Sequence, residues 1–237
     1  MPILAGLFWL IGIGSAKSQL KVGLGYQQGF FNMPNANLPV ERFNDRGFLF
    51  KNMPKMRFPG GEIYSAAYRH DRLLLELTLN TRRARVSAES FDGAILMRRD
   101  VRFSVQAFSL GFGYGFVDEE GFALYVCGAI DVGRMSFLSR LGQKETVGRV
   151  PYQLFSRSTH TGLGANVRFL WRESKDALIT FSLSPYIQYA LLTHDFIRMH
   201  QLLNPADWHL DGSTFPGRPT NFGVMFQVDI DLLRFLE

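Results

Sequence analysis

The chain has 237 residues, with 22 phenylalanines, 8 tyrosines and 23 glycines, and it lacks long helical periodicity, so we expect an all-β fold. The formal net charge of +5 is modest, and the basic residues are scattered without a dense run, which argues against a nucleic-acid-binding surface. The single cysteine, Cys127, excludes an intramolecular disulfide, and we expect it to be a small packing residue of the interior.

Residues 1–18 are typical of an export signal. Ile3 to Ile13 form an apolar stretch that is too short for a spanning helix, and Ala16 to Ser18 precede an expected cleavage site before Gln19. No Lys or Arg precedes the apolar stretch, so only the amino terminus supplies positive charge there. We predict a cleaved signal over 1–18 and a mature domain over 19–237; the alternatives are a buried N-terminal strand or a membrane anchor.

Eight segments of alternating apolar and polar residues follow along the chain, and period-two alternation indicates β-strands. The last segment is the clearest, because Phe222 to Leu232 alternate with Asn221 to Asp231 over about a dozen residues. The expected strands cover 19–31, 61–70, 72–88, 99–116, 121–136, 160–172, 177–194 and 219–235.

Short and long connections alternate between these strands. The short ones are His70-Asp71, 117–120 and 173–176; the long ones are 32–60, 89–98, 137–159 and 195–218. In an up-and-down meander, alternate connections lie at opposite ends, so every short turn falls at one end and every long loop at the other. This asymmetry is typical of bacterial outer-membrane barrels. The sequence therefore predicts an all-β fold, an eight-stranded antiparallel up-and-down transmembrane β-barrel.

The two faces of the strands are expected to meet different surroundings. Long apolar stripes, such as Leu73 to Leu79 and Phe122 to Val132, would face lipid, whereas a lipocalin-like soluble barrel would have the inverse arrangement. Two positions interrupt the pattern. At Pro185 we expect a bulge, and from Phe103 to Phe108, where the alternation changes phase, we expect a bulge or an earlier lipid boundary. The opposite, interior faces carry ionisable, amide or very small residues, among them Lys21, Glu76, Arg82, Asp131, Arg168, Gln188, Asp229, Gly111 and Gly113.

On strand count, loop parity and alternation, residues 19–237 resemble the eight-stranded OmpA/OmpX-like group of outer-membrane barrels. The Ser-Gln junction after the signal is similar to that of outer-membrane proteins of the Bacteroidota. The resemblance implies an integral protein of the Gram-negative outer membrane. A barrel of eight strands fills with side chains, which argues against a diffusion pore. Interior ion pairs are expected among Lys21, Glu76, Arg168 and Asp229, with a proton or ion path through them as the alternative.

Two groups of residues are candidates for chemistry. Ser156, Ser158 and His160 could supply a nucleophile and a base for trimming lipid A acyl chains, but they share the phase of the interior and no acid is evident nearby. The last long connection carries potential zinc ligands whose spacing fits no short signature, and 196–203 could form an amphipathic turn of helix. These ligands are His194, Asp195, His200, Asp207, His209 and Asp211. We assign no catalytic, cofactor-binding or metal-binding residue and expect no cofactor.

The first long connection could contribute a basic outer rim that pairs with lipopolysaccharide phosphates, or it could simply be a solvated loop. Its charged residues are Arg42, Arg46, Lys51, Lys55 and Arg57, with Glu41 and Asp45. The expected partners are membrane lipids, lipopolysaccharide and proteins bound by the external loops. We expect a non-enzymatic scaffold or surface-loop binding protein, or an accessory component of a secretion or motility assembly. The alternatives are a lipid A acyl hydrolase or transferase and a secreted lipocalin-like carrier.

Overall fold

The computed structural model describes residues 18–32, 34–46, 49–57, 59–204 and 216–235. The expected signal over 1–18 therefore lies outside the described residues except for Ser18, and so do Asp207, His209 and Asp211. The side chain of Arg46 is likewise outside the description.

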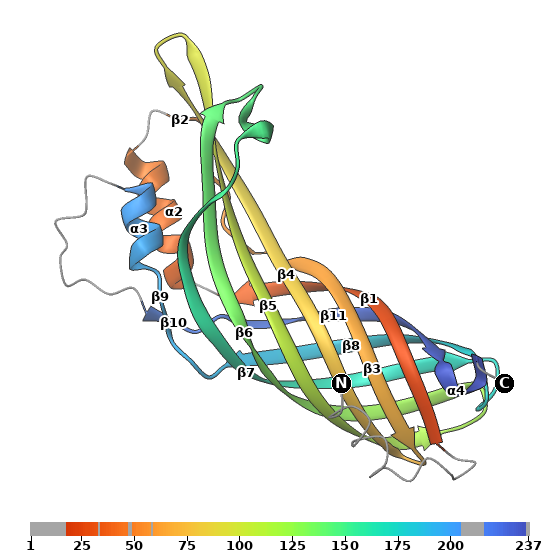
Figure 1. Ribbon diagram of the computed structural model, residues 1–237. Helices are drawn as coiled ribbons and strands as arrows, with labels where there is room; N and C mark the ends of the chain where they lie inside the picture. Colours follow the sequence, from red (N-terminus) through yellow and green to blue (C-terminus); the bar gives the residue numbers. More distant parts are fainter. Residues whose placement is uncertain (1–17, 33, 47–48, 58, 205–215, 236–237) are drawn as a thin grey trace, which may run out of the picture.

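Eight antiparallel strands form a closed hydrogen-bonded ring (Figure 1). Each strand pairs with its neighbours in the chain, and the ring closes where β1 pairs with β11, from Lys21 opposite Asp231 to Asn32 opposite Thr220. The up-and-down barrel predicted from the sequence is therefore confirmed. The ring consists of β1 (Ser18–Asn32), β3 (Gly60–His70), β4 (Leu73–Asp92), β5 (Ile95–Asp118), β6 (Phe122–Gln143), β7 (Gln153–Arg172), β8 (Ile179–Ala190) and β11 (Thr220–Asp231).

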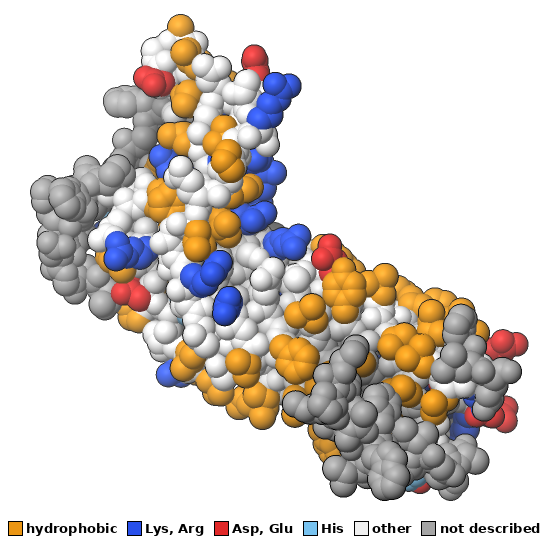
Figure 2. Space-filling model, in the orientation of Figure 1, with side chains coloured by type: hydrophobic (Ala, Val, Ile, Leu, Met, Phe, Trp, Pro, Cys, Tyr) orange, Lys and Arg blue, Asp and Glu red, His pale blue; other side chains and the backbone are white. Residues whose placement is uncertain are grey.

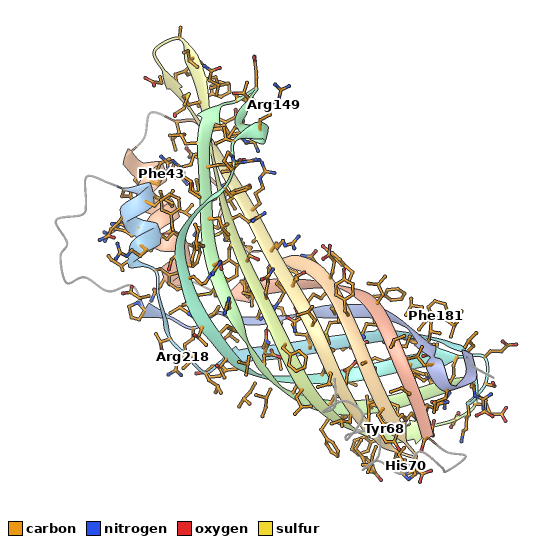
Figure 3. The ribbon with its side chains drawn as sticks, viewed as in Figure 1. Phe43, Tyr68, His70, Arg149, Phe181 and Arg218 are labelled. Atoms are coloured by element: carbon orange, nitrogen blue, oxygen red, sulfur yellow. The ribbon has the colours of Figure 1, made fainter. Side chains whose placement is uncertain are left out.

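An apolar belt surrounds the barrel, as the alternation predicted. On β5 every second side chain from Phe108 to Phe116 is exposed, while the residues between them are buried. This stretch is about 27 Å long at about 3.4 Å per residue, which suits the hydrocarbon thickness of a bilayer crossed at a tilt. Figure 2 shows apolar side chains over the barrel wall, and in Figure 3 Phe181 points away from it. Other exposed residues of the belt are Leu24, Tyr64, Leu79, Ile130, Val132, Leu163, Ile187, Phe222, Val224 and Phe226.

A barrel wall with this belt is a transmembrane barrel, because no water-facing arrangement stabilises such a continuous apolar band. The interior of a soluble carrier would be apolar, whereas the inward residues of β11 include Asn221, Gln227, Asp229 and Asp231, all buried. Among the described residues, none of the helices is both long enough and apolar enough to span a bilayer.

The prediction of four long connections is wrong for two of them, because most of their residues belong to strands. Residues 89–98 belong to β4 and β5, which are joined by a tight turn in which Gly93 has φ +60°. Residues 137–159 are mostly the ends of β6 and β7, joined over 144–152 through a 3-10 turn, η1 (Val147–Arg149). The ends of these four strands continue beyond the belt and bend away from the barrel axis (Figure 1). We call this part, residues 81–106 and 134–159, the extension.

Two helices cover the inward face of the extension (Figure 1). They are α2 (Pro34–Arg46) and α3 (Ile197–Leu203). The amphipathic turn expected near 196–203 is confirmed as α3, but α2 was not predicted, since Pro39 inside it is a poor helix residue. Short elements complete the fold: β2 (Leu49–Lys51) on the edge of β4, β9 (His194–Asp195) paired with β10 (Pro216–Gly217), and α4 (Leu232–Phe235) after β11.

A second hydrophobic core lies between these helices and the extension. Phe103 of β5 is fully buried and packs edge-on against Phe31 at 4.9 Å between ring centroids. Phe43 of α2 packs against the same core from the helix side (Figure 3). The core consists of Phe31, Ala36, Val40, Met53, Met56, Ala84, Val86, Ala88, Val101, Phe103, Val105, Ala107, Met135, Phe137, Phe196, Met199 and Leu203.

The bulge expected at Pro185 does not form, and of the two expectations for 103–108 the structure shows the earlier lipid boundary and no bulge. The pairing of β5 with β4 and β6 is continuous from Phe103 to Phe108, so the change of phase reflects a change of surroundings and not of register. At Pro185 the register of β8 with β11 is unbroken, while the pairing of β8 with β7 is interrupted between Asn166 and Phe169. Proline has no N–H for the ladder, and here the pairing is interrupted without an extra residue.

Candidate functional site

The interior of the barrel is held by a polar network that crosses from wall to wall. Arg168 of β7 donates from Nη2 to both carboxylate oxygens of Glu76 on β4, at 2.8 and 2.7 Å, and to Gln227 Oε1 on β11 at 3.2 Å. Gln227 in turn donates to Ser65 Oγ on β3 at 2.9 Å. The expected ion pair of Glu76 and Arg168 is confirmed. Both side chains are buried, so each offsets the desolvation of the other.

Lys21 and Asp229, the other two residues expected to form interior ion pairs, form no salt bridge among the described residues. Lys21 Nζ donates to Thr180 Oγ1 at 3.2 Å. A cavity of about 70 Å³, lined in part by Arg82 and Asp131, remains inside the barrel, with room for only a few waters. This volume is far below that of a diffusion channel, in agreement with the expectation of a filled interior.

A serine and two histidines meet at the end of the barrel from which the extension arises. Ser158 Oγ of β7 lies 2.9 Å from Nδ1 of His194 on β9, and the ring of His194 stacks on that of His160 with centroids 6.1 Å apart. The structure thus brings Ser158 and His160, two of the candidate residues on β7, into contact with His194 of the last long connection. Ser156, two residues earlier on β7, is opposite Phe137 and is not part of this contact.

Within 18–204 and 216–235, apart from the gaps given above, this Ser–His pair has no third group of the kind that nucleophilic catalysis requires. In the described residues no carboxylate contacts His194. The neighbouring Asp195 accepts the backbone N–H of Ile197 with Oδ1 at 3.0 Å. His194 and His160 are also buried on the inward face, away from the lipid that an acyl hydrolase would attack. The described residues contain no group of three potential metal ligands, so the zinc hypothesis gains nothing from the part of the last connection that the structure describes.

The first long connection holds a packed structure and not a solvated loop. Asn44 of α2 accepts the Met53 N–H and donates to the Met53 carbonyl, both at 2.9 Å. Asn37, two turns earlier, accepts the Met56 N–H at 2.8 Å. These two asparagines fasten the segment 52–57 to the helix and bury Met53 and Met56 in the second core. Of the basic rim expected here, Lys55 is paired with Glu41.

The outward face of the extension carries a cluster of arginines that converges on one buried carboxylate. Arg85 of β4, Arg98 of β5 and Arg140 of β6 all form salt bridges to Asp100, whose side chain is fully buried. The Arg98 Nε and Arg140 Nε donors lie 2.9 and 2.8 Å from the Asp100 oxygens. We call this face, with its arginines Arg83, Arg85, Arg98, Arg102, Arg134, Arg140 and Arg157, the arginine face.

Charge balance on the arginine face favours binding of anions. Burial alone would raise the pKa of Asp100, but the hydrogen bonds from Arg98, Arg140 and Arg85 outweigh it and hold the pKa below its ordinary value. Nearby, the hydrogen bond from Lys144 lowers the pKa of Glu89. Asp100 is therefore ionised at neutral pH, yet its single charge cannot neutralise three guanidinium groups.

The arginine face was missed in the sequence, where the basic residues look scattered. The signal was present as alternation: Arg83 and Arg85 occupy the same face of β4 that holds Leu73 to Leu79 further down the strand. An outward stripe that changes from leucine to arginine marks the level at which the surroundings change from lipid to water.

No family model matches the chain, and no curated protein matches it. Among solved structures it is similar to Ail of Yersinia pestis, with 12% identity over 90% of this chain and 99% of that one and a TM-score of 0.43. It is also similar to the neisserial surface protein NspA, with 10% identity, 92% and 99% coverage and a TM-score of 0.47. The N-terminal barrel of OprF from Pseudomonas aeruginosa has 13% identity, 89% and 97% coverage and a TM-score of 0.32. These neighbours are small outer-membrane barrels, and the fold described above stands on its own hydrogen-bonded ring.

Proposed function

We propose that this protein is an integral scaffold of the bacterial outer membrane that displays a folded, helix-capped sheet at the cell surface. The observation that carries the proposal is the second hydrophobic core, in which Phe103 and its neighbours pack under α2 and α3 beyond the apolar belt. A chain whose loops served only to close the barrel would not need a packed core outside the bilayer. Such a rigid surface is suited to presenting side chains to a partner.

The orientation follows from the same asymmetry. Outer-membrane barrels have short turns on the periplasmic side and long connections outside, and the turns after β3, β5 and β7 are all short and at one end. The extension and both helices are at the other end (Figure 1), so we place them on the outer surface. An exported chain of the Gram-negative envelope, with a cleaved signal over 1–18, accords with this orientation. Lipopolysaccharide and surface proteins are the partners proposed for it.

Tag accessibility tests this proposal. A short epitope inserted between Gly93 and Ala94, at the tip of the extension, should be labelled on intact cells. The same epitope inserted between Glu119 and Glu120 should be labelled only after the outer membrane is permeabilised. The protein should fractionate with outer membranes and migrate faster on a gel when it is not heated. Labelling at 119–120 on intact cells, or recovery of the protein without detergent, would overturn the proposal.

A second candidate function is lipid A acyl hydrolysis, favoured by the 2.9 Å contact of Ser158 with His194. Its test is the acyl composition of lipid A in cells that carry the wild-type protein, Ser158→Ala or His194→Ala. The scaffold proposal expects identical lipid A in all three. An acyl chain lost only with the wild-type protein would establish the enzyme instead.

A further inference from the structure

We propose that the arginine face binds the phosphate groups of outer-leaflet lipids, so that the extension rests on the membrane surface. This inference rests on the proposed location of the barrel in the outer membrane. It assigns a lipid partner to the arginine face, which is formed by strands β4 to β7 and not by the first long connection. Four observations carry it: the position of the arginines relative to the belt, the bend of the extension, the excess of positive charge and the fixed geometry of the guanidinium groups.

The arginines begin one row beyond the last row of the belt. In the register of the sheet, Leu79, Phe108 and Val132 lie side by side, and the next outward row places Arg134 beside Gln106. The row after that is Arg83, Ser104, Ser136 and Arg157. Two residues along a strand are about 7 Å, so the first cations stand about 7 to 14 Å along the strand from the edge of the hydrocarbon. Lipid phosphates occupy this region of a bilayer.

The bend of the extension turns the arginine face toward the membrane. In Figure 1 the strands β4 to β6 leave the barrel axis and run outward, with the helices on the side away from the apolar belt. Figure 2 shows Lys and Arg side chains gathered along the side of the extension that looks back toward the belt. A planar bilayer around the belt would therefore lie beneath these cations, while α2 and α3 would face the medium.

The arginine face has more positive charge than the protein neutralises. Among the outward residues of its described strands, 81–89, 98–106, 134–140 and 157–159, the carboxylates are Asp100 and Glu89, and Glu89 is paired with Lys144. Arg83, Arg134 and Arg157 are exposed and have no ion-pair partner among the described residues. Guanidinium groups bind phosphate oxygens through paired hydrogen bonds, so phosphate complements this surface in both charge and geometry.

Several of the guanidinium groups are held in place before any ligand binds. Asp100 fixes Arg85, Arg98 and Arg140, and the ring of Tyr152 lies 4.5 Å from the guanidinium carbons of both Arg102 and Arg140. Arg102 also has a buried Nε with no hydrogen-bond partner among the described residues. A surface that is ordered in advance loses less side-chain entropy when it binds, which strengthens binding to an anion. A loop that was basic only for solubility would not be ordered in this way.

Titration with lipid A of different phosphate content tests the proposal. The full-length mature chain, folded in a zwitterionic detergent, is titrated with fluorescent lipid A that carries two phosphates, one or none. The test variant is the triple substitution Arg83→Gln, Arg134→Gln and Arg157→Gln, which leaves the salt bridges of Asp100 intact. The control removes the same charge on the helix side through Lys55→Gln, Arg57→Gln and Arg198→Gln, three exposed residues.

We expect the wild-type affinity to fall about tenfold or more when both phosphates are removed, and by a similar factor in the test variant. The control variant should bind as the wild type does, and added salt should weaken binding. Equal affinity for the lipid without phosphates, or equal loss in both triple variants, overturns the proposal. A soluble phosphorylated or sulfated oligosaccharide that binds as tightly as lipid A would also overturn it, because the occupant would then not be a membrane lipid.

The two proposals fail separately in this experiment. Every sample is also run unheated and heated on a gel, and its tag accessibility is measured in cells. If the wild-type chain does not fold as a heat-modifiable membrane barrel, the proposed function fails. If it folds and reaches the surface but its lipid binding does not depend on phosphate, only the lipid-phosphate site is refuted.

Discussion

Phe103 and Phe108 lie on one continuous strand and on opposite faces of it, and each is in apolar surroundings. Phe103 is fully buried beneath the helices, whereas Phe108 is 52% exposed on the outer wall. Between them the apolar side of β5 changes from outward to inward while the pairing with β4 and β6 continues without a shift. The bilayer therefore ends on this strand between the two phenylalanines, and each of the following predictions depends on that boundary or on the packing to either side of it.

The loss of stability caused by an arginine on the outward face of β5 should differ sharply between the two sides of this boundary. Phe112 is outward and 58% exposed in the middle of the belt, so Phe112→Arg should destabilise the barrel by about 2–4 kcal/mol, since the cation must leave water or draw water into the bilayer. Gln106→Arg, on the same face of the same strand but beyond the boundary, is the control and should cost less than about 1 kcal/mol. The measurement is the free energy of unfolding in lipid vesicles by denaturant titration. Equal values for the two variants would contradict the belt, and so would a negligible cost at Phe112, as expected of a soluble carrier.

The interior network should show strong coupling between Glu76 and Arg168. Glu76→Gln leaves the buried Arg168 without its charged partner, and we expect a loss of about 3–5 kcal/mol. Arg168→Met should cost a similar amount for the same reason. The double variant Glu76→Gln, Arg168→Met removes both charges and should be much more stable than the sum of the two single effects predicts. Additive losses in the unfolding free energies would show that the two side chains do not act as a pair.

The barrel could be predicted from the sequence because a bilayer imposes one rule along every strand. Where apolar residues alternate with polar ones, as from Phe222 to Leu232, a closed barrel places the apolar residues against lipid and the polar residues inside. It also pairs every backbone N–H and C=O group. The same rule misled us at residues 89–98 and 137–159, which we predicted as loops; arginines such as Arg98, Arg140 and Arg157 occupy the outward face there in place of apolar residues. In water the outward face of a strand is polar, and the inward face is apolar only if something covers it.

The helices that cover the inward face of the extension could not be predicted from the local sequence pattern. The helix α2 contains Pro39, and it is stabilised by Asn37 and Asn44, which bind the backbone of residues 19 and 9 positions away in the chain. Such contacts follow from tertiary packing and leave little trace in helix propensity. The contact of Ser158 with His194 is likewise formed between residues far apart in the chain. Each residue could be named as a candidate from its type and position, but their contact could not be predicted.

The two asparagine clamps predict where proteases will cut on the cell surface. The double variant Asn37→Ala, Asn44→Ala should lose about 2–3 kcal/mol of local stability, because it leaves the Met53 and Met56 backbone groups without their partners. Trypsin added to intact cells should then cut at Lys55 or Arg57 much faster than in the wild type. Asn52→Ala, an exposed asparagine beside the same segment, is the control and should leave the cleavage rate unchanged. Equal cleavage of the double variant and the wild type would show that the clamps do not hold this segment.

Acid should loosen the extension through Asp100. The arginines hold the folded pKa of Asp100 below its ordinary value of 3.8, so this carboxylate contributes stability that is complete above that value. The contribution is lost as the pH falls below about 4 and Asp100 takes up a proton, because the three salt bridges then lose their common anion. Hydrogen exchange of the backbone amides in 98–102 and 138–142, corrected for intrinsic rates, should therefore show lower protection at pH 3 than at pH 6.

The variant Asp100→Asn separates this effect from general acid unfolding. It should lower the stability of the extension by about 2 kcal/mol at pH 6, since a neutral amide cannot replace hydrogen bonds to a charged group. It should also remove most of the difference between pH 6 and pH 3 in these amides. Asp92→Asn, at the exposed tip of the same hairpin, is the matched control and should keep the wild-type profile. If Asp100→Asn retains the full pH dependence, the titrating group lies elsewhere, and the arginines are not organised by Asp100.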